Sequence, residues 1–300
     1  MSKLGYSLTA LAALVSFSFT FCAQAQTSSD AQHPKSSAKV HVKPGSRDDI
    51  NAIGNRDIVG KDFYSLDKEI ELGKVESKRA EEHLKFVDDP AVNEYINRIG
   101  QNLVHNSDVK IPVTIKVVDS DEVNAFSVIG GYLYVNSGMI LDCQNEAELT
   151  GVMAHAIAHQ AARHATRMWT REQMLRIVNT PMISVIGDPR SDGLGLIIPL
   201  AMMKYHRAFE MEADYFGIQY LYKSGYDPAA FVALLERKDT AHIQPGSFAA
   251  GLAEEPLPAE RIAAAKKEIA GILPPNDHLI VNTPEFDSIQ ARLKQHKTPQ

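Results

Sequence analysis

Beyond residue 60, apolar side chains recur at every third or fourth position over long segments, which is the spacing of an amphipathic helix. Residues 65–86 carry such positions among many charges, and this pattern predicts a solvated helix. Residues 91–103 place four apolar side chains on one stripe, which predicts a second helix packed on a core: Val92, Tyr95, Ile96 and Ile99. Residues 146–168 and 208–223 are two further runs of helix-favouring composition without proline.

Short β segments interrupt these helices. Residues 113–118 alternate apolar and polar side chains, which is the period of a strand. Residues 132–135 form a second β segment, which follows two glycines and ends at an Asn-Ser-Gly turn signal. Toward the C-terminus the pattern predicts a helix over residues 259–273, a short strand at 279–281 and a last helix from residue 285.

The first 60 residues do not follow this pattern. A short positive start precedes an apolar stretch, and Ala23-Gln24-Ala25 then offers a small-x-small cleavage site. The stretch is shorter than the roughly 20 residues that a membrane span needs, so we predict a signal peptide over residues 1–25. Residues 26–60 are polar and predict a disordered leader. The folded domain is then expected over residues 61–295 of an exported protein, periplasmic or secreted.

Composition narrows the class of protein. The chain has 300 residues, of which 44% are hydrophobic and 23% charged, as in a globular protein with a sizeable core. A formal net charge of −6 gives no electrostatic reason to expect a nucleic-acid partner. Removal of the signal peptide would leave Cys143 as the only cysteine, so no intramolecular disulfide can form. We expect Cys143 to be a small buried hydrophobe.

Candidate metal ligands stand on the helical runs 146–168 and 208–223. His155 and His159 are four residues apart, so they would lie one turn apart on one helix face and could bind one ion. Glu210 and Asp214 have the same spacing on the second run. Glu210 offers a third ligand, and Asp214 offers an acceptor for the far nitrogen of a ligating histidine. Taken alone, these residues are also compatible with packed histidines and a solvated acidic face.

The motifs around these residues resemble a known family. HAIAHQAARH, EMEADYFG and GYDP are similar to segments of the zinc metallopeptidases that include the CAAX-prenyl endopeptidases, the heat-shock protease HtpX and the periplasmic β-barrel-assembly-enhancing protease. The resemblance covers about residues 65–293. It implies a zincin-like domain, α+β and mostly α, with a small antiparallel sheet beside the two motif helices. It also implies one zinc ion (Zn2+) per chain, with Asp214 behind the ligands His155, His159 and Glu210.

The resemblance further implies a place for the substrate. Asn124-Ala125-Phe126, followed by Gly130, Gly131 and Tyr132, is similar to the family's NAF…GG segment. Residues 130–135 would then be an edge strand, along which an extended peptide could lie through main-chain hydrogen bonds. The expected partners are unfolded or extended polypeptides and outer-membrane assembly partners, and no nucleic acid.

The chain departs from the family pattern where the chemistry is concentrated. The family's glutamate after the first histidine is Ala156 here. That carboxylate would take a proton from metal-bound water and pass it to the leaving amine, and a methyl group can do neither. General acid–base catalysis is worth about 10²–10⁴ in rate, so we predict weak or absent proteolysis with metal binding retained. A second departure is Glu255, which stands where relatives often carry a histidine.

Other features are assigned by position. His164 follows His159 by five residues, about 140° around a continuous helix, so we predict that it does not share the ion. The apolar segment 177–203, broken by glycine and proline, could be a lid, a membrane-facing loop or ordinary core. Candidates for lining the cleft are Tyr205, His206 and Arg207.

Two function classes follow. In the first, the protein is a periplasmic zinc endopeptidase of envelope polypeptides with little or no activity. In the second, it is a pseudo-peptidase that keeps zinc and the peptide cleft and serves as a chaperone-like or scaffold module for envelope proteins. A purely structural domain without metal is a third possibility. Retention of all three ligand types beside the loss of the base favours binding over catalysis.

Overall fold

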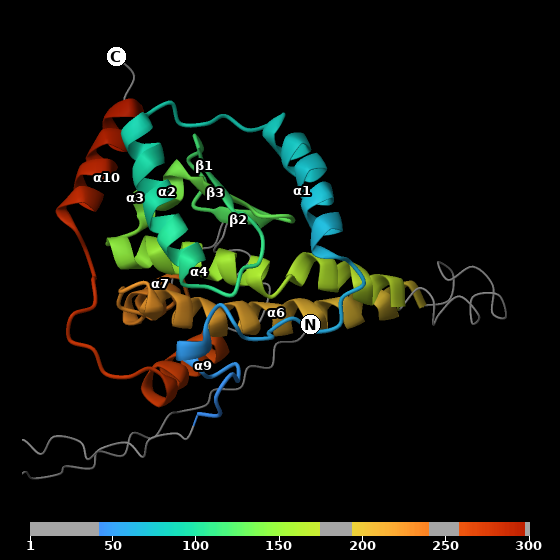
Figure 1. Ribbon diagram of the computed structural model, residues 1–300. Helices are drawn as coiled ribbons and strands as arrows, with labels where there is room; N and C mark the ends of the chain where they lie inside the picture. Colours follow the sequence, from blue (N-terminus) through green and yellow to red (C-terminus); the bar gives the residue numbers. More distant parts are fainter. Residues whose placement is uncertain (1–41, 175–193, 240–257, 298–300) are drawn as a thin grey trace, which may run out of the picture. The chain divides into compact units, whose positions relative to one another are not determined.

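A computed structural model describes residues 42–174, 194–239 and 258–297, which form a mostly helical fold around a small sheet (Figure 1). This confirms the α+β, mostly α class. The predicted signal peptide, Glu255 and the first part of segment 177–203 lie outside the described residues. The helices are α1 (Leu66–Glu81), α2 (Pro90–His105), α3 (Ser137–Asp142), α4 (Glu146–Ala161), α6 (Leu194–Lys223), α7 (Ala229–Asp239), α9 (Pro258–Ile272) and α10 (Pro284–Lys297), with a 3-10 turn, η1, at Ile50–Ala52.

Polar side chains just ahead of the helices determine where three of them begin. Ser65 accepts a hydrogen bond from the Lys68 amide at the start of α1, and Asp89 accepts from the Ala91 amide at the start of α2. The Asn145 side chain accepts from the Glu148 amide at 2.9 Å and caps α4. Each cap satisfies a backbone donor that the helix itself leaves unpaired.

The sheet has three strands: β1 (Thr114–Val118), β2 (Ala125–Val128) and β3 (Tyr132–Asn136). Their order is β1-β3-β2, with β3 parallel to β1 and antiparallel to β2. The predicted antiparallel sheet is therefore wrong in one of its two pairings. The predicted strand at residues 279–281 is reduced to a single bridge between Ile280 and Tyr226.

The prediction that residues 130–135 form an edge strand is also wrong. β3 is the central strand, and its backbone pairs with β1 on one side and β2 on the other. After β1 the chain crosses to the opposite edge of the sheet and forms β2 there. It then turns back into the central β3 through Gly130 and Gly131, whose φ angles are +80° and +91°. The alternation of side chains reports which faces a strand presents, and it carries no information on which strands lie beside it.

The core lies between one face of the sheet and the helix pair α4 and α6. Leu133 and Val135 of β3 point into this core, and almost every residue of α4 is buried. α4 and α6 run side by side below the sheet (Figure 1). Gly217 permits the close approach, because a Cβ there would lie 3.0 Å from the Cα atom of His155. The two helices that carry the candidate ligands are thereby held in direct contact.

α4 ends earlier than the sequence predicts. The predicted run over residues 146–168 is broken after Ala161, and a new helical segment begins at His164. Arg163 adopts a φ of +56°, a conformation that costs a non-glycine residue about 1–3 kcal/mol. Ion pairs with Glu69 at 2.5 Å and Asp62 at 3.4 Å anchor the Arg163 side chain. These contacts from outside the helix stabilise a break that helix propensity does not reveal.

The predicted disordered leader extends too far. Ile50 and Ile58 are buried in the core, although both fall within the predicted leader of residues 26–60. Arg56 is also buried, and it donates to Asp108 at 2.6 and 3.0 Å. The segment is poor in apolar residues, but Ile50, Ile58 and Arg56 meet matching partners elsewhere in the fold. Such pairings compensate for the cost of ordering a polar segment.

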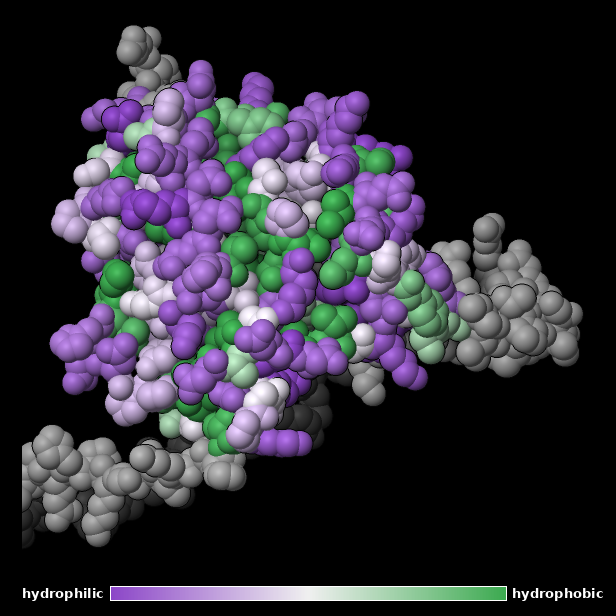
Figure 2. Space-filling view, viewed as in Figure 1, coloured by the Kyte–Doolittle hydropathy of each residue, from purple (hydrophilic) through white to green (hydrophobic). Residues whose placement is uncertain are grey.

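The α2 stripe is buried as predicted, and so is Cys143, which is free. Burial raises the pKa of the Cys143 thiol. Figure 2 shows hydrophobic residues gathered in the middle of one face, over the sheet between α1 and α2. Among the described helices, none is both long enough and apolar enough to cross a membrane.

Candidate metal centre

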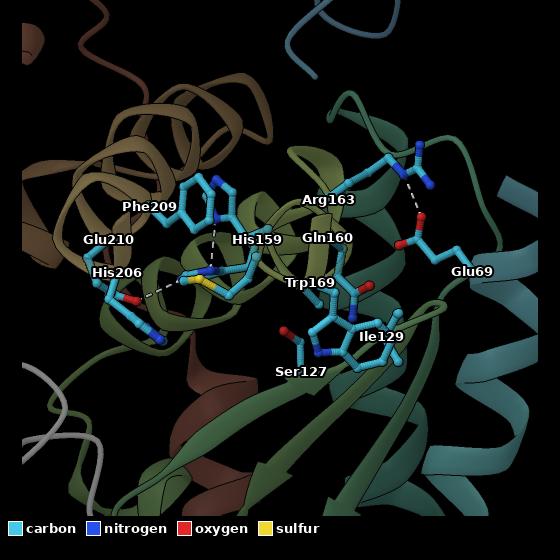
Figure 3. Close-up of a pocket in the computed structure, with 13 residues that line it drawn as sticks. Glu69, Ser127, Ile129, His159, Gln160, Arg163, Trp169, His206, Phe209 and Glu210 are labelled. Atoms are coloured by element: carbon cyan, nitrogen blue, oxygen red, sulfur yellow. Dashed lines mark hydrogen bonds and ion pairs between the residues drawn. The ribbon is translucent and has the colours of Figure 1, made fainter. Parts of the chain in front are cut away.

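The candidate metal centre lies where α6 passes α4. His155 and His159 stand one turn apart on α4, and their Nε2 atoms are 3.1 Å apart. Glu210 faces them from α6, with Oε2 3.4 Å from His155 Nε2 and Oε1 3.3 Å from His159 Nε2. Figure 3 shows His159 and Glu210 meeting at one side of a pocket. The structure therefore brings together the three residues proposed as ligands from the sequence.

The spacing of these atoms suits a small tetrahedral cation. Zinc bonds to imidazole nitrogen and carboxylate oxygen are about 2.0–2.2 Å long, which places ligand atoms about 3.3–3.6 Å apart. The observed separations are 3.1, 3.3 and 3.4 Å. Two imidazole lone pairs facing each other at 3.1 Å would repel without a cation or proton between them. Two nitrogens and one carboxylate thus fit zinc and leave a fourth position open.

His155 is held from behind by a carboxylate and an arginine. His155 Nδ1 lies 2.9 Å from Asp214 Oδ1 and donates to it, so that in the neutral imidazole the lone pair is on Nε2, the nitrogen that faces Glu210. Arg261 donates to both oxygens of Asp214, from Nη2 to Oδ1 at 2.5 Å and from Nε to Oδ2 at 2.6 Å. Arg261 is 0% exposed and Asp214 is 4% exposed. This buried pair fixes both the orientation and the tautomer of His155.

The charges of the site support one another. Burial opposes charge on His155, but hydrogen bonds to Asp214 and Glu210 outweigh it and raise the pKa of the imidazole to about 9. Burial also opposes ionisation of Glu210, yet His155 and His159 hold the pKa of this carboxyl below its usual value. Arg261 and His155 likewise overcome burial and lower the pKa of Asp214. Ionised Glu210 is the form that binds a metal.

His159 meets another histidine on its far side. His164 Nδ1 lies 2.9 Å from His159 Nδ1, and His164 Nε2 lies 3.1 Å from Glu212 Oε2. Burial lowers the pKa of His164 to about 3, so this imidazole is neutral. His164 faces the side of His159 opposite to Nε2, as expected for a residue that does not share the ion. The reason given from the sequence was wrong, however, because the helix is not continuous between the two.

Ala156 lies on α4 directly after the first candidate ligand and is 5% exposed. Gln160, one turn further along the same face, reaches the sheet. Its Nε2 donates to the carbonyls of Val128 and Tyr132 at 2.9 and 3.0 Å, and its Oε1 accepts from the Gly131 amide at 3.2 Å. The face of α4 that carries residue 156 is thus directed toward the turn between β2 and β3.

A cavity of about 310 Å³ opens beside His159 and Glu210 (Figure 3). Its wall combines apolar side chains with polar groups. The apolar wall is formed by Ile129, Ala165, Met168, Trp169 and Phe209. The polar lining is formed by Glu69, Ser127, Gln160, Arg163, His164 and His206. A cavity of this size accommodates one large side chain or a short stretch of peptide.

The remaining candidates occupy different places. His206 lines the cavity, whereas Arg207 forms an ion pair with Glu260. The side chain of Tyr205 lies outside the described part of the chain. Gly130 packs against α1, where a Cβ would approach the Gly73 Cα atom at 2.7 Å. His164, Glu212 and Arg261 were not singled out as contributors to the centre from the sequence. His164 and Glu212 nevertheless lie within the two motifs HAIAHQAARH and EMEADYFG.

Comparisons with known proteins place the chain among peptidases. Residues 90–269 match the family described as Peptidase family M48. A Vibrio cholerae protein, named as a candidate beta-barrel assembly-enhancing protease, is 32% identical over 215 residues, 68% of this chain and 44% of its own length. The Beta-barrel assembly-enhancing protease of Escherichia coli is 30% identical over 241 residues, 75% of this chain and 48% of its own length.

A mitochondrial relative is also similar. The Mitochondrial metalloendopeptidase OMA1 of Schizosaccharomyces pombe is 29% identical over 177 residues, which are 56% of this chain and 50% of the relative. The chain thus spans about half the length of the curated relatives it matches. Both motif helices lie within the matched residues 90–269.

Proposed function

The chain belongs to peptidase family M48, and from this membership we propose that it is a zinc-binding envelope protein that takes extended polypeptides and cleaves them weakly or not at all. The single observation that carries the proposal is the convergence of His155, His159 and Glu210 at tetrahedral spacing. Zinc bound there would supply a Lewis acid that activates water and polarises a peptide carbonyl. We assign these three residues as the ligands and Asp214 as the support of His155.

The position after the first ligand limits the chemistry. Ala156 has no group that could accept a proton, and Gln160, the next polar residue on that face, is already bonded to three backbone groups of the sheet. His164 is neutral but is directed at His159 and Glu212. Loss of a general base reduces a rate by about 10²–10⁴, so trace turnover at most is expected.

We place the substrate peptide along β2 rather than along residues 130–135. Among the described residues, the outer edge of β2 has no strand beside it, whereas β3 is paired on both sides. Ser127 of β2 and the adjoining Ile129 line the cavity next to His159 and Glu210. A peptide added to this edge would form main-chain hydrogen bonds with β2 and extend past the metal centre. Gly130, Gly131 and Tyr132 then shape the turn that positions this edge.

The cellular setting is proposed from the relatives and the predicted leader. The relatives' name, beta-barrel assembly-enhancing protease, supports outer-membrane assembly partners for this chain. With the predicted signal peptide over residues 1–25, it supports a periplasmic location. Because the chain covers 44–48% of these relatives, activities of their remaining length are not carried over. The peptidase domain is proposed to span residues 61–295, and the packed segment just before residue 61 is part of the same fold.

Metal content tests the site directly. The protein is purified without chelator, and bound zinc is measured by elemental analysis beside a His155→Ala variant. One zinc per chain in the parent, lost in the variant, is the expected result. A parent without zinc under these conditions, even after incubation with added zinc, would refute the proposal.

Restoring the base tests the reason for low activity. Ala156→Glu should cleave a loose substrate such as casein at least about 100-fold faster than the parent, because general acid–base catalysis is worth about 10²–10⁴. Ala156→Gln has the same size without a basic carboxylate, and it should remain as slow as the parent. Equal cleavage by all three proteins would show that position 156 does not limit the activity.

The pseudo-peptidase remains the alternative, and the absence of a carboxylate at Ala156 favours it. A protein that binds chains without cutting them would hold unfolded polypeptides along β2 and release them intact. Binding of a fluorescent unfolded polypeptide that depends on zinc, together with unchanged substrate length after long incubation, would establish this role. Measurable cutting by the parent, abolished by His155→Ala, would instead establish the peptidase.

A further inference from the structure

Each of the two candidate imidazole ligands is supported from behind, but by different means. His155 is backed by Asp214, as predicted from the sequence, and Asp214 is held in turn by Arg261, which was not predicted. His159 is backed by His164, a histidine that the sequence excluded from the ligand set and left without a role. The contact joins Nδ1 of one ring to Nδ1 of the other at 2.9 Å. It therefore involves the nitrogen of His159 that faces away from Glu210.

The break after α4 creates this contact. On a continuous helix His164 would lie about 140° from His159, out of reach. The φ of +56° at Arg163 instead folds the chain back, so that the rings of His159 and His164 lie with centroids 4.8 Å apart and planes at 85°. Arg163 donates to Glu69 and to the Tyr64 carbonyl, at 2.5 and 2.7 Å, which anchors the turn. The strained residue thus delivers His164 to its place.

The hydrogen-bond partners determine which nitrogen carries each proton. Glu212 Oε2 is a carboxylate oxygen that also accepts from Arg167 at 2.8 Å, so His164 Nε2 must be the donor at 3.1 Å. In the tautomer that carries its proton on Nε2, His164 presents only a lone pair on Nδ1. His159 Nδ1 must therefore donate to it, which leaves the lone pair of His159 on Nε2. That lone pair faces Glu210 at 3.3 Å.

The His164 ring has little freedom to turn away. It is 5% exposed, and it stacks on Phe209 with centroids 4.3 Å apart and an angle of 9° between the planes. The Arg167 guanidinium lies over the Phe209 ring, 4.7 Å from its centroid. Packing therefore fixes the ring plane, and the two hydrogen bonds fix the direction of its protons.

We propose that His164 is a positioning residue for the metal centre, which holds His159 in the tautomer whose Nε2 lone pair faces the ion. This inference rests on the proposed zinc site. His164 does not touch the ion. It acts through His159, with Glu212 and Arg167 behind it, in parallel with Asp214 and Arg261 behind His155. Without it, His159 could carry its proton on Nε2 and present an N–H group to the metal.

The experiment measures metal binding rather than turnover. Zinc affinity of the purified protein is determined by competition with a chromogenic chelator, and Co2+ loaded in place of zinc reports ligand geometry through its visible spectrum. His164→Phe keeps a flat ring for the stack on Phe209 and removes both nitrogens. Support of this kind is worth about 10–100-fold in metal affinity, so His164→Phe should weaken zinc binding by that factor and change the Co2+ spectrum.

Two further variants separate positioning from packing. In His164→Asn the side-chain oxygen can accept from His159 Nδ1, so affinity and spectrum should return most of the way to the parent's. Tyr226→Phe removes a buried hydrogen bond to Glu146 at 2.6 Å, at the far end of α4, about 13 Å from His155 along the helix. It should leave both readouts unchanged, because it reduces stability without touching the centre.

The outcomes are distinct. His164→Phe that binds zinc with the parent's affinity and spectrum would overturn the inference, as would equal losses in the Asn and Phe variants. A parent that binds no zinc would refute the proposed function itself. Should His164→Phe fail to fold, as seen by circular dichroism, Glu212→Gln tests the same chain of contacts. Glu212→Gln should weaken zinc binding less than the loss of both His164 nitrogens does. An unchanged zinc affinity in Glu212→Gln would also overturn the inference.

Discussion

Asp214→Asn tests how the centre is supported, because it replaces one oxygen by an NH2 group and preserves size. The carboxylate of Asp214 now serves two donors, His155 Nδ1 at 2.9 Å and the Arg261 guanidinium at 2.5 and 2.6 Å. An amide has a single acceptor oxygen and a donor group. Both orientations of the new side chain therefore leave one partner unsatisfied.

The two orientations fail in different ways. If the amide oxygen faces His155, the NH2 group faces Arg261 and two donors oppose each other. If the oxygen faces Arg261, the NH2 group donates to His155 Nδ1 and forces the proton onto Nε2, the atom that should bind the ion. Arg261 is 0% exposed, and its next carboxylate is Glu210 at 3.6 Å. The guanidinium would then compete with the metal for Glu210.

The expected magnitudes follow from these contacts. Removing one partner of a buried ion pair costs about 3–5 kcal/mol, so the metal-free variant should lose about that much in its free energy of unfolding. Loss of the hydrogen bond behind a ligating histidine costs about 10–100-fold in metal affinity. Zinc affinity should fall by at least this factor, because both the tautomer of His155 and the position of Glu210 are affected.

A matched control exists in the same chain. Asp108 forms a comparable buried pair with Arg56 at 2.6 and 3.0 Å, and Tyr220 donates to it at 2.9 Å. Asp108→Asn should therefore cost similar stability and leave zinc affinity unchanged. Urea unfolding of the metal-free proteins and chelator competition give the two quantities. If both variants lost the same stability and Asp214→Asn still bound zinc like the parent, the assigned role of Asp214 would be refuted.

Two further predictions concern stability and helix contact. Burial raises the pKa of Glu268 to about 9 from 4.5, although Gln219 donates to it at 3.0 Å, so the folded state favours the protonated carboxyl. The stability that this protonated carboxyl gives to the folded state is fully present below pH 4.5 and is lost as the pH rises toward 9. At about 1.4 kcal/mol per pKa unit, the free energy of unfolding of the parent should fall by up to about 4 kcal/mol between pH 5 and pH 8, relative to that of Glu268→Gln. Urea unfolding at the two pH values measures this change, and an equal change in the parent and the variant would contradict the prediction. Gly217→Ala would place a Cβ 3.0 Å from the His155 backbone, so it should cost about 1–3 kcal/mol and weaken zinc binding, whereas Gly271→Ala, which has open space, should do neither.

Local patterns in the sequence were enough for most elements of this fold. The apolar stripe of α2 is buried as its spacing predicts, and Asn145 caps α4 through the Glu148 amide. Each of these features depends on residues within one or two helical turns of each other. Their physical causes, helix periodicity and capping, act over the same short range, so the sequence alone carries them.

The candidate ligands were found in the sequence for a related reason. Two histidines four residues apart on a helix share a face in any fold, and Glu210 and Asp214 do the same. The match between the two pairs came from resemblance to a family, and the structure brings the atoms to 3.1–3.4 Å. The absence of a base at Ala156 is likewise a property of the sequence, whatever the surroundings are.

Only the tertiary structure decided how these local pieces are combined. The order β1-β3-β2, the ordered segment around Ile50 and Arg56, and the break at Arg163 all depend on partners distant in the chain. Periodicity reports which side of an element is buried, but it does not report against what. Arg163 stays at a positive φ because Glu69 and Asp62 hold it, and His164 reaches His159 for that reason. The sequence thus determined the candidate ligands, whereas long-range contacts determined what holds them in place.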